Sequence, residues 1–342
     1  MSIARRSRKV LQKVLFGDTL LPQEFFLGLP EPQKEIAVWL HGLGSRAPLD
    51  VTSRHLMACA SPLTVGIALD QRDRPGEKDI EYLTLKYCER NGREQVLGEI
   101  SLKPTKIISE DGLDLALFEV RGSVNYCLPK TRLWAHYLLH AYSQWRKADT
   151  SGMKMSRLER RAAMVMFIRP HPVSLVSLAD ETGGNIFPMN LMGDLGDEYF
   201  AFALKESRRA AHLVERTRRI ALSNIPLSQA PLAYQLAINH TKERIEWDEL
   251  PFATNLSTKF NIPVPVFAQR VREVDVMKVH YIGSHVLFVA RIVHDEIFSN
   301  SLGLSVIHGF YQAWRLNGHS VELQASREED SIYKNGSKVE SR

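Results

Sequence analysis

Two stretches in the second half of the sequence carry residue types suited to ligand binding. The first, "ETGGNIFPMN" from Glu181 to Asn190, mixes two glycines, a proline and two asparagines with three large apolar residues. It directly follows the strand-like run "PVSLVSLAD". A β-turn needs only about four residues. A stretch of this length and composition is typical of backbone that passes close to a flat, partly polar ligand.

The second stretch, "KESRRAAHLVERTRR", predicts a helix whose N-terminus holds an anion. Ser207 is the predicted N-cap because an apolar helical face follows it, made of Ala210, Ala211, Leu213 and Val214. The free N–H groups of a helix N-terminus attract phosphate, and Lys205, Arg208 and Arg209 add positive charge beside it. The alternative is a surface helix with a basic outer side.

Composition restricts the class of protein. The 342 residues are 44% hydrophobic and 24% charged, which is ordinary for a soluble globular chain and long enough for two domains. No run approaches the roughly 18 apolar residues of a membrane helix. The net charge of +5 is small and concentrated at the start and in "KESRRAAHLVERTRR", so we expect no nucleic-acid partner and no membrane partner.

The cysteines and the N-terminus indicate a cytoplasmic protein. Cys59, Cys88 and Cys127 show no CxxC spacing, which argues against a zinc site, an iron–sulfur cluster or a disulfide scaffold, and we expect no metal. The basic start lacks the apolar region of a secretory signal.

The predicted elements are mostly strands, with a barrel in each half. Strand patterns recur in "LTVGIALD", "EYLTLKY", "LDLALFEV", "VSLVSLAD", "EYFAFAL", "VPVFAQRVREVDV" and "HVLFVARIV". Helices are predicted around "TRLWAHYLLHAYSQWR" and "SRRAAHLVERTRR". This proportion of strands to helices is typical of the mainly β class, here a β-barrel with a few helices.

The two halves show signs of an internal repeat. "LFEVR" from Leu117 matches "LFVAR" from Leu287, and "YSQWR" from Tyr142 matches "YQAWR" from Tyr311, both at an offset near 170. A weaker match aligns "RHLMACASPLTVGIALD" with "RAAMVMFIRPHPVSLVSLAD", which implies that extra residues of the second copy begin at "ETGGNIFPMN".

The same patterns divide the chain into five parts. Polar stretches separate a basic N-terminal extension (1–34), a barrel-like domain (35–147), a linker (148–160), a second barrel domain (161–316) and a disordered tail (317–342).

The order "RPHPVSLVSL…GGNIFPMNLMG…YFAFALKESRRAAHLVE…ALSNIP…GSHVLFVARI…YQAWR" resembles the flavin reductase-like, FMN-binding split β-barrel family over about 162–315. The resemblance implies that FMN is bound by Asn185, Ile186, Phe187, Pro188, Met189 and Asn190 at the ring, and by Lys205, Ser207 and Arg208 at the phosphate. The G-D-H of the family reads Gly283, Ser284 and His285 here. His285 is the candidate catalytic residue, although a His beside a strand start is more often structural.

The implied activity is an NAD(P)H-dependent flavin oxidoreductase, which passes electrons to a small acceptor, to free flavin or to a partner oxygenase. Members of this family are usually homodimers. The first half lacks a counterpart of "GGNIFPMN" and "KESRR", so we predict a flavin-free copy that packs on the second as an internal pseudo-dimer, with an unrelated regulatory domain as the alternative. The alternative function is a non-enzymatic split-barrel module that binds flavin or haem as a carrier or sensor.

Overall fold

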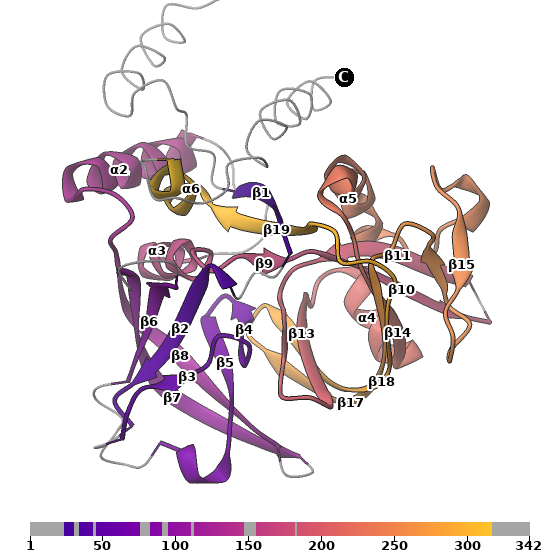
Figure 1. Ribbon diagram of the computed structural model, residues 1–342, viewed down its shortest axis with the longest axis horizontal. Coiled ribbons are helices and arrows are strands. Elements are labelled where there is room, and N and C mark those ends of the chain that lie inside the picture. Colours follow the sequence, from indigo (N-terminus) through magenta and orange to yellow (C-terminus); the bar gives the residue numbers. More distant parts are fainter. Residues whose placement is uncertain are drawn as a thin grey trace, which may run out of the picture.

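The computed structural model describes residues 24–30, 34–43, 46–75, 83–90, 95–110, 113–146, 155–181 and 183–316. Its two large antiparallel sheets have seven strands each, and each sheet is curled into a half-open barrel. Figure 1 shows the two barrels side by side, with a small third sheet across the top. The predicted mainly β, split-barrel architecture is confirmed.

Each large sheet is formed by one half of the chain. The first sheet contains β2 (Ile36–His41), β3 (Leu49–Asp50), β4 (His55–Ala60), β5 (Leu63–Leu69), β6 (Thr84–Glu89), β7 (Val96–Glu110) and β8 (Leu113–Asn125). The second contains β10 (Ser174–Asp180), β11 (Gly183–Met189), β12 (Met192–Asp194), β13 (Tyr199–Lys205), β14 (Arg219–Asn224), β17 (Arg270–Ile282) and β18 (His285–Ile297). The strand runs predicted from sequence fall in these strands, except that "VPVFAQRVREVDV" covers the end of β16 (Pro263–Pro265) as well as the first part of β17, with a break between them.

The two sheets have the same strand order. The first runs β3-β2-β6-β7-β8-β5-β4, and the second runs β11-β10-β14-β17-β18-β13-β12. Numbering the strands of each sheet along the chain gives one identical connectivity. In this correspondence β8 matches β18, in agreement with the offset between "LFEVR" and "LFVAR".

The topology also corrects the weaker sequence match. β5 occupies the place of β13 in its sheet, whereas β10 corresponds to β2, so "LTVGIALD" and "PVSLVSLAD" are not equivalent strands. The main excess of the second half lies between β14 and β17 and not at "ETGGNIFPMN". It contains β15 (Thr254–Leu256), β16 (Pro263–Pro265), α5 (Ala230–Leu236) and the 3₁₀ turns η4 (Leu227–Gln229), η5 (Ala237–Thr241) and η6 (Trp247–Glu249).

Continuously apolar strands arise because both faces of the central strands are covered. On β13, Phe200, Phe202 and Leu204 face the core of the second barrel, whereas Ala201 and Ala203 face the first half. The small residues let the two sheets approach closely. Leu117 of β8 and Leu287 of β18 belong to the same interface cluster.

Different helices complete the two barrel cores. In the second barrel, α4 (Arg209–Thr217) buries Ala210, Ala211, Leu213 and Val214 among the strands. In the first barrel this role falls to α3 (Arg157–Met166), which packs on β7 and β8. A capping box joins Ser156 and Glu159 at the start of α3, within the segment predicted as linker.

A small sheet connects the chain ends to both halves. β1 (Glu24–Leu29) pairs with β19 (Gly303–His308), which also pairs with β9 (His171–Pro172). β1 therefore forms an ordered strand inside the predicted N-terminal extension. After β19, α6 (Gly309–Leu316) packs on the first barrel, where the buried Glu35 carboxylate accepts hydrogen bonds from Tyr311 Oη at 2.8 Å and Arg315 Nη2 at 3.1 Å. The predicted tail (317–342) lies outside the described residues.

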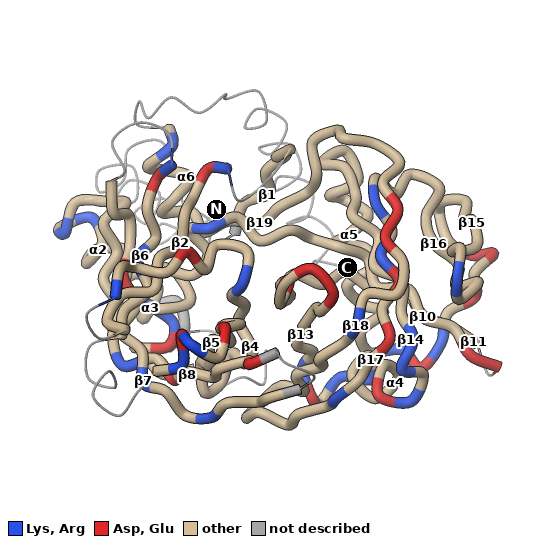
Figure 2. The backbone as a smooth tube through the Cα atoms, turned by 60° about the horizontal axis from the view of Figure 1, so that its bottom comes forward, with Lys and Arg blue, Asp and Glu red and all other residues tan. Residues whose placement is uncertain are grey.

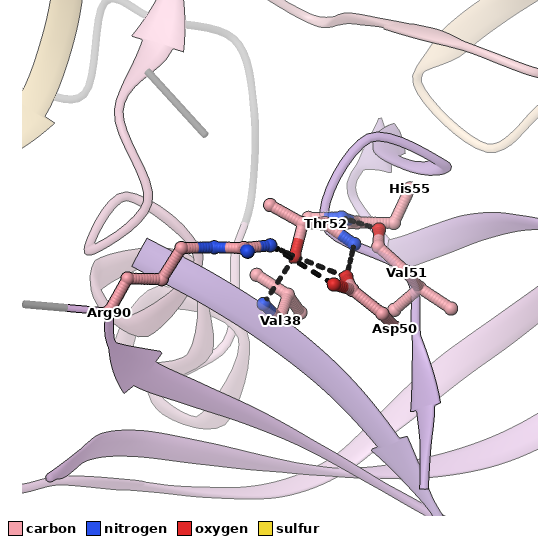
Figure 3. A network of polar contacts seen from close by, with 6 residues as sticks. All are labelled: Val38, Asp50, Val51, Thr52, His55 and Arg90. Carbon is pink, nitrogen blue, oxygen red and sulfur yellow. Dashed lines mark hydrogen bonds and ion pairs between the residues drawn. The ribbon is translucent and has the colours of Figure 1, made fainter. Parts of the chain in front are cut away.

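The first barrel replaces the region of β11 with a self-contained polar network around Thr52 (Figure 3). Thr52 Oγ1 accepts from Val38 N at 2.8 Å and from Arg90 Nη2 at 3.2 Å, and it donates to Asp50 Oδ1 at 2.5 Å. Burial raises the pKa of Asp50, but the Thr52 hydrogen bonds and the Arg90 charge lower it overall. These side chains stabilise one another and leave β3 as a short structural strand.

The predicted helix "TRLWAHYLLHAYSQWR" is α2 (Lys130–Arg146). Figure 2 shows that acidic and basic residues are intermingled over both halves of the described chain. None of the described helices is long and apolar enough to span a membrane.

Candidate functional site

A cavity of about 420 Å³ opens where the ends of β11 and β13, the start of β18 and the η5 turn come together. We call it the basic cavity. Six of the residues predicted as site residues line it: Pro188, Met189, Asn190, Lys205, Arg208 and His285. Volumes of about 300–1,000 Å³ are typical of small-molecule sites. Two stretches that are separate in the sequence therefore meet here.

The positive charge comes from the turn between β13 and α4. Lys205 is the last residue of β13, and Arg208 N donates to Lys205 O at 3.0 Å to close a tight turn. Both side chains are half-buried and line the cavity. The first free N–H groups of α4 follow directly, so this corner presents cationic side chains beside a helix N-terminus.

The prediction that Ser207 caps this helix is wrong. The N-cap is Arg208, with extended backbone and no side-chain cap bond, and Ser207 is exposed in the turn outside the cavity lining. Arg209 also points elsewhere, because its Nε lies 3.6 Å from Glu243 Oε2. His212, on the same helix, is exposed.

Apolar groups form the walls of the basic cavity. Met189 and Leu204 line it from β11 and β13, Leu191 lines it from the bend between β11 and β12, and Ile238 lines it from η5. Ile238 is 63% exposed, so it covers the cavity from the solvent side without being part of the core. The combination of apolar walls with one cationic corner suits a ligand that has a flat apolar part and an anionic end.

Asn185, Ile186 and Phe187 have other partners and do not line the basic cavity. Asn185 is fully buried, and its Nδ2 donates to Asn239 O and Lys242 O, both at 3.0 Å. Ile186 and Phe187 are fully buried in two apolar clusters. The family resemblance implied that these residues bind FMN, which stays a prediction; in this structure their side chains pack within the sheet edge.

The exposed backbone edge of β11 is also occupied. Asn239 Nδ2 donates to Ile186 O at 2.9 Å, His240 Nε2 donates to Pro188 O at 2.8 Å, and Ile245 N donates to Gly184 O at 2.9 Å. The segment around η5 thus covers this edge and reaches the cavity through Ile238, His240 and Thr241. Sequence analysis missed these lining residues, and "AINHT" carries no motif that could have identified them.

His285 is buried at the inner end of the basic cavity. It is 4% exposed and pairs in register with Lys205 across β13 and β18. Burial and the nearby Lys205 charge lower the pKa of His285 to about 4. The imidazole is therefore neutral at physiological pH.

The first half of the chain makes polar contacts with the site around His285. Cys59 Sγ lies 3.7 Å from His285 Nδ1, and Ala60 N donates to the same nitrogen at 3.4 Å. Ser284 N donates to Ser61 O at 2.8 Å. A Cβ on Gly283 would lie 2.4 Å from Pro62 Cδ, so the glycine is required for this close approach. No sequence pattern could reveal contacts between residues more than 220 positions apart.

The first half lacks an equivalent polar pair. The register β5–β8 places Ala68 opposite Leu115, where β13–β18 places Lys205 opposite His285. Ala68 and Leu115 are buried in the interface cluster with Leu195 of the second half. After β5, Arg74 forms a bidentate ion pair with Asp114. Apolar packing and an internal ion pair thus stand in place of a cationic cavity.

Among the described residues, no group of three His, Cys, Asp or Glu side chains is arranged to hold a metal ion. All three cysteines are free thiols. His171 is buried, with Nε2 3.2 Å from Met166 O.

Comparison with known proteins gives a family for the second half. Residues 166–315 match the model described as the flavin reductase like domain. No curated protein matches the chain in sequence.

Several solved structures share limited similarity. The FMN-binding protein from Thermus thermophilus with bound 1-cyclohex-2-enone is 24% identical over 37% of this chain and 71% of its own, with a TM-score of 0.34. The styrene monooxygenase flavin reductase from Pseudomonas putida S12 is 18% identical over 43% and 93%, with a TM-score of 0.36. Flavoredoxin from Methanosarcina acetivorans is 13% identical over 39% and 71%, with a TM-score of 0.35.

Proposed function

The second half of this chain is a flavin reductase like domain, and from this premise we propose that the protein is an FMN-dependent oxidoreductase with its flavin in the basic cavity. The observation that carries the proposal is the meeting of Lys205 and Arg208 with the apolar walls of one cavity. A flavin mononucleotide requires this combination, because its ring faces are apolar and its phosphate is anionic.

The residues present fit FMN in their chemistry. Lys205 and Arg208 would hold the phosphate by charge-assisted hydrogen bonds, next to the N–H groups that begin α4. Met189, Leu191 and Leu204 would contact the ring, and Asn190 adds an amide able to bond the polar ring edge. Ile238 on η5 would shield the bound ring from water.

FMN, when bound, supplies a site that accepts hydride from NADH or NADPH. The chain itself then needs to bind, orient and exclude water, and no nucleophile is required. Lys205 and His285 form the inner wall of the cavity, so they are placed to fix the ligand that enters. We propose a small molecule, free flavin or a partner oxygenase as the electron acceptor.

We further propose one flavin per chain in an internal pseudo-dimer of duplicated barrels. The identical strand order of the two sheets supports the duplication. The replacement of the Lys205–His285 pair by Ala68 and Leu115 supports a flavin-free first half. Titration of the purified chain with FMN at concentrations well above the Kd should saturate at one equivalent. Saturation at two equivalents would contradict the flavin-free assignment.

The activity itself is tested by spectroscopy of the FMN-saturated chain. Addition of NADH or NADPH under anaerobic conditions should bleach the flavin absorbance, and a second addition of acceptor should restore it. A chain that binds FMN but stays oxidised with both dinucleotides would be a flavin-binding module and not this enzyme. A chain that binds no FMN would place the proposed site elsewhere.

A further inference from the structure

The first half of the chain contacts the proposed site by apolar packing on Leu191 and Ala203 and by polar groups around His285. Three groups surround its Nδ1 atom: Ser284 Oγ at 2.9 Å, Ala60 N at 3.4 Å and Cys59 Sγ at 3.7 Å. Cys59 and Ala60 end β4 of the first sheet. The polar groups that the first half brings to His285 therefore converge on one ring nitrogen.

The backbone contact determines the role of this nitrogen. A peptide N–H can only donate, so Nδ1 must present its lone pair to Ala60 N. Ser284 Oγ is then free to donate to the same lone pair. A neutral imidazole carries one proton, which must reside on Nε2 when Nδ1 is an acceptor.

The surroundings also prevent protonation of the ring. A proton on Nδ1 would oppose the Ala60 N–H and would bring a positive charge near Lys205, which pairs with His285 in register. Lys205 from β13 and Cys59 from β4 are the titratable groups that face the ring, and neither supplies a negative counter-charge beside it as a carboxylate would. Burial adds to this effect.

Backbone contacts join the two halves beside His285. Ser284 N donates to Ser61 O at 2.8 Å, and Ser284 O accepts from Glu206 N at 3.1 Å. Gly283 lies in the left-handed region, with φ of 53°, against Ser61 and Pro62. These contacts hold the start of β18, and with it His285, against the turn between β4 and β5.

Resting on the proposed function, we infer that the first half is a positioning element, which fixes His285 as a neutral Nε2–H donor toward the ligand in the basic cavity. His285 lines this cavity, and with Nδ1 engaged at the interface, Nε2–H is the only donor that the ring can offer there. His285 then orients the ligand by a hydrogen bond and does not exchange protons with it. Substitution of His285 by Asn or by Gln therefore tests the contacts of Nδ1 and of Nε2 one at a time.

The tautomer is tested first, in the FMN-free full-length chain labelled with ¹⁵N-histidine. A long-range ¹H–¹⁵N spectrum, with His285→Gln used to assign the signal, should show the Nε2–H form unchanged from about pH 7 to about pH 5, as expected for a pKa displaced below that window. An Nδ1–H form, or titration near the ordinary His value, would overturn the inference. This result does not depend on flavin binding.

The second test uses a reciprocal pair of variants. An Asn amide reaches the position of Nδ1, whereas a Gln amide reaches that of Nε2. His285→Asn should keep the Ala60 amide protected from hydrogen exchange and weaken FMN by about tenfold, the effect of one lost hydrogen bond. His285→Gln should keep the FMN Kd within about threefold and expose the Ala60 amide to exchange about tenfold faster.

The outcomes separate this inference from the proposed function. Equal loss of FMN affinity in both variants, or unchanged Ala60 exchange in His285→Gln, would refute the positioning role even if FMN binds well. If the wild-type chain binds no FMN, the proposed function fails, and the spectrum together with Ala60 exchange still decides whether the first half fixes the tautomer.

Discussion

Removal of the cationic corner should distinguish FMN from riboflavin, which lacks the phosphate. We consider Lys205→Ala combined with Arg208→Ala. Each side chain is half-buried, so each charge-assisted contact should contribute about 1.5 kcal/mol, the lower end of the range for charged hydrogen bonds. Together they give about 3 kcal/mol, which corresponds to a roughly 150-fold higher Kd for FMN.

Riboflavin affinity should change by less than about threefold, because the removed groups face only the phosphate. Fluorescence titration of both ligands against wild type and variant measures the difference. Arg209→Ala is the matched control, since Arg209 is on the same turn but pairs with Glu243 at 3.6 Å and does not line the cavity. Equal weakening of FMN and riboflavin in the double variant, or an Arg209→Ala effect of the same size, would refute the phosphate assignment.

Three further outcomes follow from the packing. Asn185→Ala should lower the free energy of unfolding by about 2 kcal/mol in a denaturant titration, because two hydrogen bonds to the η5 segment are lost. It should weaken the binding of FMN and of riboflavin equally. A loss of FMN binding alone, at unchanged stability, would show that Asn185 contacts the ligand. Gly283→Ala should destabilise the chain by about 3 kcal/mol or more through its clash with Pro62 and Ser61, whereas Gly196→Ala, also at positive φ but with no atom within 4 Å, should cost less than half as much. The free energy of unfolding should fall as the pH is lowered from about 6.5 to about 4. Burial lowers the pKa of His285 to about 4 and those of His171 and His308 to about 3, so in this window the unfolded chain takes up protons that the folded chain does not. The expected slope is up to about 1.4 kcal/mol per pH unit for each histidine. A stability that is flat over this window would contradict their neutral buried state.

Local sequence patterns predicted much of the fold. The strand runs were correct because apolar residues and β-branched residues recur at the spacing of covered strands, and this signal needs no knowledge of the partner strand. The helix after β13 was also predicted, although its N-cap was placed one residue too early. Which residue is the N-cap depends on the backbone dihedral angles at that residue, and the sequence does not show that Arg208 rather than Ser207 has the extended backbone that precedes the helix.

Local sequence patterns also indicated part of the candidate site. Pro188 to Asn190 and Lys205 to Arg208 are short segments whose composition indicates ligand binding wherever they lie. That they line one cavity is a consequence of the sheet, which brings the ends of β11 and β13 together with the start of β18. Family resemblance extended the prediction to Asn185, Ile186 and Phe187, but the η5 segment covers this edge of the sheet in the present chain.

Tertiary structure alone decided which strands correspond and how the halves meet. Alternating apolar strands look alike, so "LTVGIALD" was matched to β10, and only hydrogen-bonded order showed that its counterpart is β13. The contact of Ala60 with His285 joins residues 225 positions apart through a backbone N–H, a group that every residue except proline carries and that no sequence motif can mark. The sequence determined the strands, the helices and the charged turn. The packing of the two sheets determined that Nδ1 of His285 faces the first half, because this contact depends on how closely β4 approaches β18.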